Sequence, residues 1–502
     1  MMRQVVRWKK KNRIRSIQRD QTNAPQINQL SDDLEENISY VQQALGKTSD
    51  LNFRTFSSER KIAIFHISGI TNTDTINEHI IERLNEGSIQ QIEDIKQIIT
   101  VNNVFEEKVR EKIIDALVKG KTVIFLESSP IAIVAETKQI ETRGIEESSA
   151  QAVIRGPKES FTESFEKNMG LLRSRIQSPQ LRLKTMTVGE VTQTNVGVAY
   201  IENIVNEKVL KEVIERISSI KVDAILDSSY IETYIKDDDR TLFPLIKDSE
   251  RPDSVAAELL EGKVAIIVDG TPFVLIAPGV FIQFFQSAED YYQNPYISSF
   301  LRILRIGSFF VSLLAPALYI AILAHHEGLI PTTLLISILA QRDGVPFPIV
   351  IEALVMEIIF EVLREAGIRM PRTVGSALSI VGALIIGQAA VEAGFVAAST
   401  VIVVSITAIS SFSIPYYSMS IVTRLLRFVF IICSSFIGIY GIVIAFIIIL
   451  LHMCDLRSFG MPYLSPFAPV RKNDLKDAVF RPSLRSLKKR PYPANKRNRI
   501  RA

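Results

Sequence analysis

One carboxylate stands in an otherwise uncharged part of the sequence. Glu392 is the only residue with a formal charge between Thr373 and Thr423. An uncompensated carboxylate next to lipid costs about 2.5–3.5 kcal/mol, so we expect Glu392 to face water, either in a lumen or at the membrane surface. On a helix that runs from residue 373 through Glu392, four side chains fall within about a 60° arc at 100° per residue. They are Val381, Ile385, Gln388 and Glu392.

This line of side chains changes from apolar to polar, as a pathway for cations would. Apolar constrictions gate channels by dewetting, and carboxylates select cations. We therefore predict that Val381 and Ile385 form a constriction and that Gln388 and Glu392 form a polar mouth. The alternative is that Glu392 only ends a helix at the membrane surface, because the following Ala393–Gly394 favours a turn.

A second set of carboxylates lies in the helix predicted over residues 349–366. Glu357, Glu361 and Glu365 recur at four-residue spacing beside Arg364, and the other positions are mostly large and apolar. Carboxylates at membrane depth face protein or water, not lipid. Two interpretations stay open: a re-entrant or interfacial helix beside an aqueous vestibule, and an amphipathic helix on the surface. In the first interpretation, Glu357 and Glu361 are vestibule carboxylates that add negative potential.

The sequence holds no pattern typical of an enzyme. It has no nucleophile–base spacing, phosphate-binding loop, dinucleotide fingerprint or cluster of metal ligands. The pair His325–His326 lacks a further ligand at metal spacing and is typical of an exposed loop. Cys433 and Cys454 are 21 residues apart, or about 31 Å along one helix, so they cannot pair with each other. We expect no catalytic residue, no cofactor and no metal site.

Helices must carry the polar side chains through a membrane. A helix needs roughly 20 apolar residues to cross the hydrocarbon core. The apolar runs are Ile306–Ala324, Thr373–Val391, Ala393–Thr423 and Phe428–Leu451. Pro415 breaks the third run, whereas the fourth is an uncharged stretch of 24 residues that predicts a single span. The sequence thus predicts an all-α polytopic transmembrane domain over residues 300–453, with four to six spans.

The residues before about 300 are typical of a soluble, mixed α/β protein. Strand-like runs that alternate with helices predict one subdomain over residues 61–142. A linker helix and a second subdomain follow over residues 143–290, where the turn Asp269–Pro272 joins two apolar strands into a hairpin. Residues 1–60 are expected to be a basic and polar extension that is partly disordered. Residues 454–502 are expected to be a basic cytoplasmic tail.

Positive charge gathers at both ends of the chain. The first 19 residues hold eight Lys or Arg and no acid, and residues 471–502 hold twelve Lys or Arg against two Asp. Basic segments next to spans stay on the cytoplasmic side and are attracted to anionic lipid. With no secretory signal in view, we expect both termini in the cytoplasm and an even number of spans. No aromatic residues interleave the basic clusters on a folded platform, so nucleic acid is not an expected partner.

Ordered motifs across residues 61–470 resemble the A subunit of GerA-type spore germinant receptors. They include RGPKESFTES (Arg155–Ser164), EGKVAIIVDGTP (Glu261–Pro272), SIVGALIIGQAAVEAG (Ser379–Gly394) and FGMPYLSPFAP (Phe459–Pro469). The resemblance implies a cytoplasmic domain of two subdomains on a multi-pass domain in the inner membrane of a bacterial spore. It also implies a transporter-like B subunit with the nutrient site and a lipoprotein C subunit. The resemblance further implies A subunits that oligomerise into a nutrient-gated cation channel.

Two other functions compete with the receptor subunit. A paralogue in the stage V sporulation pathway resembles the same A subunit and lacks its own nutrient-sensing partner, so an accessory germination protein is the first alternative. Genes for B- and C-type subunits directly downstream would favour the receptor. A secondary transporter is the second alternative, and it would contain an internal repeat of broken helices. Residues 300–453 hold no convincing repeat, which disfavours the transporter.

Overall fold

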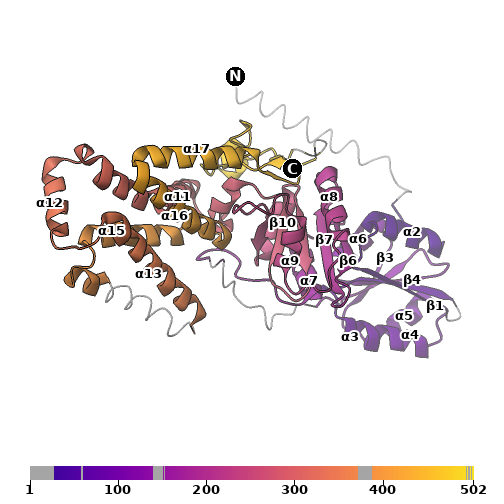
Figure 1. The fold of residues 1–502 in the computed structure, drawn as a ribbon. Coiled ribbons are helices and arrows are strands. Elements are labelled where there is room, and N and C mark those ends of the chain that lie inside the picture. Colours follow the sequence, from indigo (N-terminus) through magenta and orange to yellow (C-terminus); the bar gives the residue numbers. More distant parts are fainter. Residues whose placement is uncertain are drawn as a thin grey trace, which may run out of the picture.

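Three parts follow one another along the molecule (Figure 1). The computed structural model describes residues 28–57, 60–139, 151, 153–370, 387–492, 494–495, 498 and 500–501. Two α/β subdomains are followed by a region of helices, and the C-terminal segment returns to the second subdomain. The predicted fold class, a mixed α/β domain of two subdomains followed by a helical region with apolar helices, is confirmed.

The first subdomain is an antiparallel sheet with helices on both faces. Its strands lie in the order β1-β2-β4-β5-β3. Their bounds are β1 Leu51–Ser57, β2 Lys61–Ile67, β3 Val104–Glu107, β4 Thr122–Leu126 and β5 Ala132–Ala135. Successive strand residues point to opposite faces, so Phe65 packs with α2 and α6 while Ile64 packs with α3, α4 and α5. These helices are α2 Leu34–Leu45, α3 Thr73–Ile76, α4 Glu82–Glu86, α5 Ile92–Ile98 and α6 Arg110–Val118, with a π-helical turn at Asn77–Ile81.

Residues 28–57 belong to this first subdomain. Strand β1 pairs with β2 along its whole length, from Leu51 opposite Ile67 to Ser57 opposite Lys61. Helix α2 is capped by the Asp33 side chain and buries four apolar residues against the sheet, Leu34, Ile38, Val41 and Leu45. The partly disordered extension expected over residues 1–60 therefore does not hold for residues 28–57. Residues 1–27 lie outside the described part of the chain.

The second subdomain repeats the strand order of the first. Its antiparallel sheet has the order β6-β7-β9-β10-β8, which again places the third strand at the far edge. The bounds are β6 Leu181–Val188, β7 Thr194–Ile201, β8 Lys247–Ser249, β9 Val264–Val268 and β10 Val274–Ala277. Helices α7 (Phe165–Arg175) and α10 (Pro252–Leu260) cover one face, and α8 (Glu207–Ser218) and α9 (Ser228–Ile235) cover the other.

Helix α7 holds the two subdomains together. Arg173 donates from Nε to Asp50 Oδ2 at 2.7 Å and from Nη2 to Asp50 Oδ1 at 3.1 Å, and both side chains are almost fully buried. Gly170 lies against Gly69 so closely that a methyl group on Gly170 would overlap the Gly69 carbonyl. Removing one partner of a buried ion pair is strongly destabilising, so we expect the subdomains to keep this arrangement.

The helical region follows two short 3₁₀ turns, η2 (Phe281–Phe285) and η3 (Ala288–Tyr291). Its helices are α11 Pro295–His325, α12 Thr332–Arg342, α13 Ile349–Arg369, α15 Ala398–Phe412, α16 Tyr417–Ile437 and α17 Ile439–Asp455, with a 3₁₀ turn at Glu327–Leu329. Within the described residues, α11 and α16 are long and apolar enough to cross a membrane, and α15 and α17 are shorter apolar helices. Of the predicted span 373–391, only residues 387–391 are described, and they are helical.

The single span predicted over residues 428–451 is wrong. Gly438, with φ +61°, separates α16 from α17, and the two helices form a hairpin. Glycine adopts this left-handed conformation without steric cost. A side chain at this position would also overlap His325 and His326 at the end of α11. The glycine inside the apolar run was therefore a turn signal.

Polar contacts show the relative directions of α11, α16 and α17. Arg427 of α16 contacts Ser312 of α11, and Ser435 of α16 contacts His325 of α11. Since both pairs advance together, α11 and α16 are parallel, and both run away from the α/β domain. The turn between α16 and α17 reverses the chain, and His452 near the end of α17 contacts Thr241 of the second subdomain.

Helices α13 and α15 run in the opposite direction to α11 and α16. Glu361 of α13 pairs with Arg424 of α16, and Glu357, one turn earlier, pairs with Arg427, one turn later. Helix α15 is parallel to α13, because Glu352 contacts Thr400 while Arg364 contacts Ser411. Because α11 runs away from the α/β domain and α17 returns to it, the start of α11 and the end of α17 lie on the same side of the helical region.

The C-terminal segment packs on the α/β domain. It begins with two paired short strands, β11 (Arg457–Ser458) and β12 (Met461–Pro462). Phe459 enters the core beneath α8 and α9, and Ala494 enters the core beneath α7 and α10. Two 3₁₀ turns lie between them, η5 (Leu475–Asp477) and η6 (Leu484–Ser486). The described residues of the expected basic tail are thus part of the folded domain.

Candidate functional site

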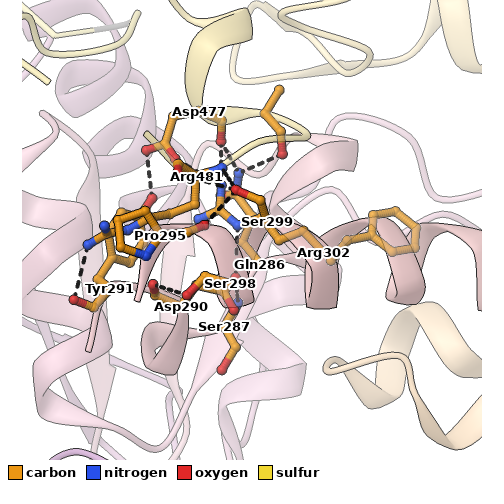
Figure 2. A network of polar contacts seen from close by, with 12 residues as sticks. Gln286, Ser287, Asp290, Tyr291, Pro295, Ser298, Ser299, Arg302, Asp477 and Arg481 are labelled. Atoms are coloured by element: carbon orange, nitrogen blue, oxygen red, sulfur yellow. Dashed lines mark hydrogen bonds and ion pairs between the residues drawn. The ribbon is translucent and has the colours of Figure 1, made fainter. Parts of the chain in front are cut away.

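A network of arginines and carboxylates joins the α/β domain to α11 (Figure 2). Asp290 in η3 accepts a hydrogen bond from Arg302 Nε at 2.9 Å and from Arg305 Nη1 at 2.8 Å. The side chains of Asp290 and Arg302 are each 1% exposed. Ser298 Oγ donates to the Asp290 carbonyl at 2.7 Å. The first turns of α11 are therefore fixed to the end of the second subdomain.

The C-terminal segment is the third member of this junction. Arg302 Nη1 donates to Asp477 Oδ1 at 2.8 Å, and the Tyr291 hydroxyl donates to Asp477 Oδ2 at 2.7 Å. Burial and the neighbouring Asp477 carboxylate raise the pKa of Tyr291 well above its ordinary value, so the phenol stays a neutral donor. Figure 2 shows Asp477 and Arg481 beside the α11 residues Ser299 and Arg302. Because the charges are shared, none of the three segments can move here without breaking a contact.

A buried chain of charges links the second sheet to α16. Lys247 on the edge strand β8 pairs with Glu258 of α10, and Glu258 also pairs with Lys263 at 2.8 Å. Burial would raise the pKa of Glu258, but the two ammonium groups outweigh it and hold that pKa at about 2. The Lys247 ammonium also lies 5.0 Å from the ring centre of Tyr416, the N-cap residue immediately before α16. The carboxylate thus stays charged between the two lysines.

Each of the two predicted vestibule carboxylates faces an arginine of α16. Glu357 pairs with Arg427, and both side chains are almost fully buried. Arg427 also donates to the Ser312 carbonyl and to Ser312 Oγ, each at 2.8 Å. Glu361 pairs with Arg424 at 2.7 Å. These contacts place Glu357 and Glu361 between helices of one chain, where charge neutralisation stabilises the packing of α13 on α16 and α11.

A third carboxylate of α13 lies at the far end of the helical region. Glu352 has a fully buried side chain and pairs with Arg342 of α12 at 2.9 Å. It accepts a hydrogen bond from Thr400 Oγ1 and from the Ala397 backbone N–H, both at 3.0 Å. Since Ala397 is the N-cap residue immediately before α15, the carboxylate satisfies its N–H group and complements the helix dipole.

The predicted pore residues are only partly within the described chain. Val381 and Ile385 lie outside it, so the arc of four side chains stays a prediction. Gln388 and Glu392 are exposed, and Gln388 Nε2 donates to Glu392 Oε1 at 2.8 Å. The chain turns immediately afterwards, where Gly394 has φ +67°. Glu392 therefore ends a helical segment at the end of the region that lies away from the α/β domain.

The described residues contain no group of three or more His, Cys, Asp or Glu side chains that could hold a metal ion. His325 and His326 instead pack at the α16–α17 turn, where His325 Nε2 lies 2.9 Å from the Ser435 carbonyl oxygen. The ring of His326 lies beside that of Tyr440. Among the described residues, the buried carboxylates of the junction and of α13 form ion pairs with arginines.

Comparison with known proteins identifies the family. The family model described as Bacillus/Clostridium GerA spore germination protein matches residues 39–492. Spore germination protein KA of Bacillus subtilis is 46% identical over 94% of this chain and 88% of the relative. Spore germination protein GerLA of Bacillus cereus is 38% identical over 92% of this chain and 96% of the relative. The chain belongs to the GerA family of spore germination proteins.

A solved structure also matches this GerA-family chain. The crystal structure of the N-terminal domain of the A subunit of the Bacillus megaterium spore germinant receptor GerK3 is 33% identical, with a TM-score of 0.41. The match covers 52% of this chain and the whole of the solved chain. With two apolar helices long enough to cross a bilayer, the GerA-family chain is a membrane-associated germination protein.

Several polar residues of this GerA-family chain were not found from the sequence. Asp290, Arg302 and Asp477 meet across almost 200 positions of the chain, and neither the spacing nor the local pattern indicated that they would. Arg424 and Arg427 also lie inside the helical bundle, where each pairs with a glutamate of α13. One signal was present in the sequence. Arg424 and Arg427 are three residues apart and lie on one face of a helix, and Glu357 and Glu361 are four residues apart and lie on one face of another. Two such faces can pack against each other with their charges paired.

Proposed function

We propose that this protein is the A subunit of a nutrient germinant receptor in the spore inner membrane. In this proposal, its copies oligomerise into a cation channel that opens when nutrient is sensed. A transporter-like B subunit and a lipoprotein C subunit are the proposed partners, and membership of the family supports them. The pathway runs along residues 373–392, with Val381 and Ile385 as the constriction and Gln388 and Glu392 as the polar mouth.

The observation that carries the proposal is the distribution of unpaired negative charge. On α13, the carboxylates Glu352, Glu357, Glu361 and Glu365 each form an ion pair with an arginine. Glu392 is exposed and has Gln388 as its hydrogen-bonding partner in the described chain. An unneutralised carboxylate attracts cations more strongly than one that shares its charge with a guanidinium group. Of these five carboxylates, Glu392 is therefore best suited to a cation pathway, while a vestibule role for Glu357 and Glu361 requires their ion pairs to open.

The direction of the helices supports a cytoplasmic α/β domain. The start of α11 and the end of α17 lie on one side, as both termini in the cytoplasm require. The basic ends of the chain favour that same side. The Glu392 mouth then lies on the opposite side of the membrane from the α/β domain, and cations leaving the spore core would pass the constriction before the mouth.

The test compares charge reversal at Glu392 with charge reversal at a matched position. Glu392→Lys should abolish cation release from spores that carry the complete receptor, because a lysine at the mouth repels cations. Glu365→Lys changes the charge by the same amount at an exposed, ion-paired carboxylate of α13 and should leave release unchanged. Ile385→Ala should instead cause leakage without nutrient, because it widens an apolar constriction.

Protein level and assembly with the partners serve as controls for all three variants. Unchanged cation release in Glu392→Lys and in Ile385→Ala spores, at normal protein level, would exclude the pathway along residues 373–392. Equal losses in Glu392→Lys and Glu365→Lys spores would show a general sensitivity to charge and would also contradict the proposal.

A further inference from the structure

The first turns of α11 have one face inside the junction and one face outside it. Ser298, Arg302 and Arg305 point into the network around Asp290. On the other face, Tyr296 is 86% exposed and Phe300 is 64% exposed. These two aromatic side chains are four residues apart and therefore lie on the same side of the helix. Nothing in the described chain covers them.

The length of α11 places this face at a membrane boundary. Thirty-one residues of helix extend over about 46 Å, whereas the hydrocarbon core is about 30 Å thick. About ten residues therefore project beyond the core. Arg302 and Arg305 are held by the carboxylates of the α/β domain, so the projecting residues are those at the N-terminal end. Tyr296 and Phe300 consequently lie at the level of the lipid headgroups.

The C-terminal segment extends the same surface. The Arg481 backbone N–H donates to Ser299 Oγ at 3.0 Å, and Ser299 Oγ donates to the Arg481 carbonyl at 3.3 Å. Phe480, which is 60% exposed, immediately precedes this contact in the chain. Three exposed aromatic side chains from two distant parts of the sequence are thus attached near the point where α11 leaves the α/β domain.

Positively charged residues flank Phe480 in the sequence. Lys472, Lys476 and Arg485 are exposed, and no ion pair of theirs occurs among the described residues. The two acidic residues of this segment are already engaged: Asp477 binds Arg302, and Asp474 accepts a hydrogen bond from the Tyr492 backbone N–H. The segment from 471 to 490 therefore carries an uncompensated positive charge.

We propose that these six residues form a surface that binds the anionic lipid headgroups of the bilayer from the side of the α/β domain. The surface consists of Tyr296, Phe300, Phe480, Lys472, Lys476 and Arg485. Aromatic side chains are enriched at the headgroup level, and basic residues bind anionic lipid there. We call this surface of six residues the membrane collar. This inference depends on the membrane association of α11 and not on ion conduction.

The test measures how close the collar lies to lipid in the full-length protein. Cys433 and Cys454 are replaced by serine, and a single fluorophore is attached through Ser483→Cys, which leaves Phe480 in place. The protein is reconstituted in nanodiscs of phosphatidylcholine and phosphatidylglycerol, with a nitroxide on the headgroup of one lipid or the other. Thr55→Cys, on the exposed strand β1 of the first subdomain, is the matched control.

The collar predicts strong quenching at position 483 and little at position 55. Nitroxide on phosphatidylglycerol should quench position 483 about fivefold more than nitroxide on phosphatidylcholine at equal mole fraction, the effect of one basic side chain near an anionic surface. Lys472→Gln combined with Lys476→Gln and Arg485→Gln should bring this ratio close to one while quenching itself persists. Phe480→Ser should weaken quenching by both lipids.

Two results would overturn the inference. Quenching at position 483 that does not exceed quenching at position 55 would show that the surface is not on the bilayer. Efficient cross-linking between copies through the cysteine at position 483, with no lipid quenching, would make the same surface an interface between subunits. Retention of the thermal unfolding temperature by each variant excludes misfolding as the cause.

Discussion

The buried ion pair between Glu357 and Arg427 allows a quantitative test of the helical packing. Both side chains are almost fully buried, and Arg427 makes two further hydrogen bonds to Ser312. In Arg427→Met the Glu357 carboxylate stays buried without its partner. Breaking a buried pair in this way costs about 3–5 kcal/mol, whereas replacing both partners by apolar residues is often neutral or stabilising.

We therefore expect strong non-additivity. Arg427→Met and Glu357→Met should each lower the free energy of unfolding by about 3–5 kcal/mol, and the double variant should lie within about 1 kcal/mol of the wild type or above it. The measurement is unfolding of the purified full-length protein in mixed micelles by a denaturing detergent, followed by helical circular dichroism.

The exposed pair Glu365–Arg369 on the same helix is the matched control. Its side chains are 56% and 78% exposed, and a surface pair of this kind contributes about 0–1 kcal/mol. The Glu365→Met and Arg369→Met cycle should therefore be nearly additive. If the losses in the Glu357–Arg427 cycle simply add, the two residues do not form a pair in the folded protein, and the packing of α13 on α16 described above is incorrect.

Three other predictions concern the remaining parts of the chain. Burial and the charges of Asp248 and Asp227 raise the pKa of Glu232 from 4.5 to about 7, so the folded state holds a proton that the unfolded state has lost. Thermal stability should therefore fall as the pH rises from about 4.5 to about 7, and Glu232→Gln should flatten this dependence. Gly438→Ala forces a left-handed conformation, which costs about 1–2 kcal/mol, and overlaps His326, so the unfolding temperature should drop clearly below that of the wild type. A cysteine at Thr333 in α12 should react with an impermeant thiol reagent in intact cells, while one at Lys488 should react only after permeabilisation; the reverse pattern would invert the proposed orientation.

The sequence predicted the elements of the helical region better than their partners. The helix 349–366 was found within three residues of its observed end because its pattern is local. Its carboxylates were assigned to water because the sequence cannot show which arginine on another helix lies opposite. A buried charge needs a partner, and that partner is determined by tertiary packing, as the pairs Glu357–Arg427 and Glu352–Arg342 illustrate.

The two subdomains show a similar limit. Both sheets have the same order of strands, which the sequence analysis did not predict. Strand patterns specify only which residues face a core, so two unrelated-looking sequences can form the same topology. Residues 28–57 were missed for a different reason: β1 is an edge strand with mostly exposed side chains and lacks the apolar alternation by which strands are recognised.

The paired carboxylates also give a way to locate the cation pathway. Arg427→Met would leave Glu357 without a neutralising charge in the middle of the helical region. If the pathway passes beside α13, this variant should change the rate or selectivity of cation release, because a new negative charge then faces the ions. If the pathway runs along residues 373–392, the variant should affect protein stability while release per assembled receptor stays the same. Glu392→Lys should abolish release in that case. The same two variants therefore distinguish a structural role of the α13 carboxylates from a role in conduction, and they do so without requiring the nutrient to be known.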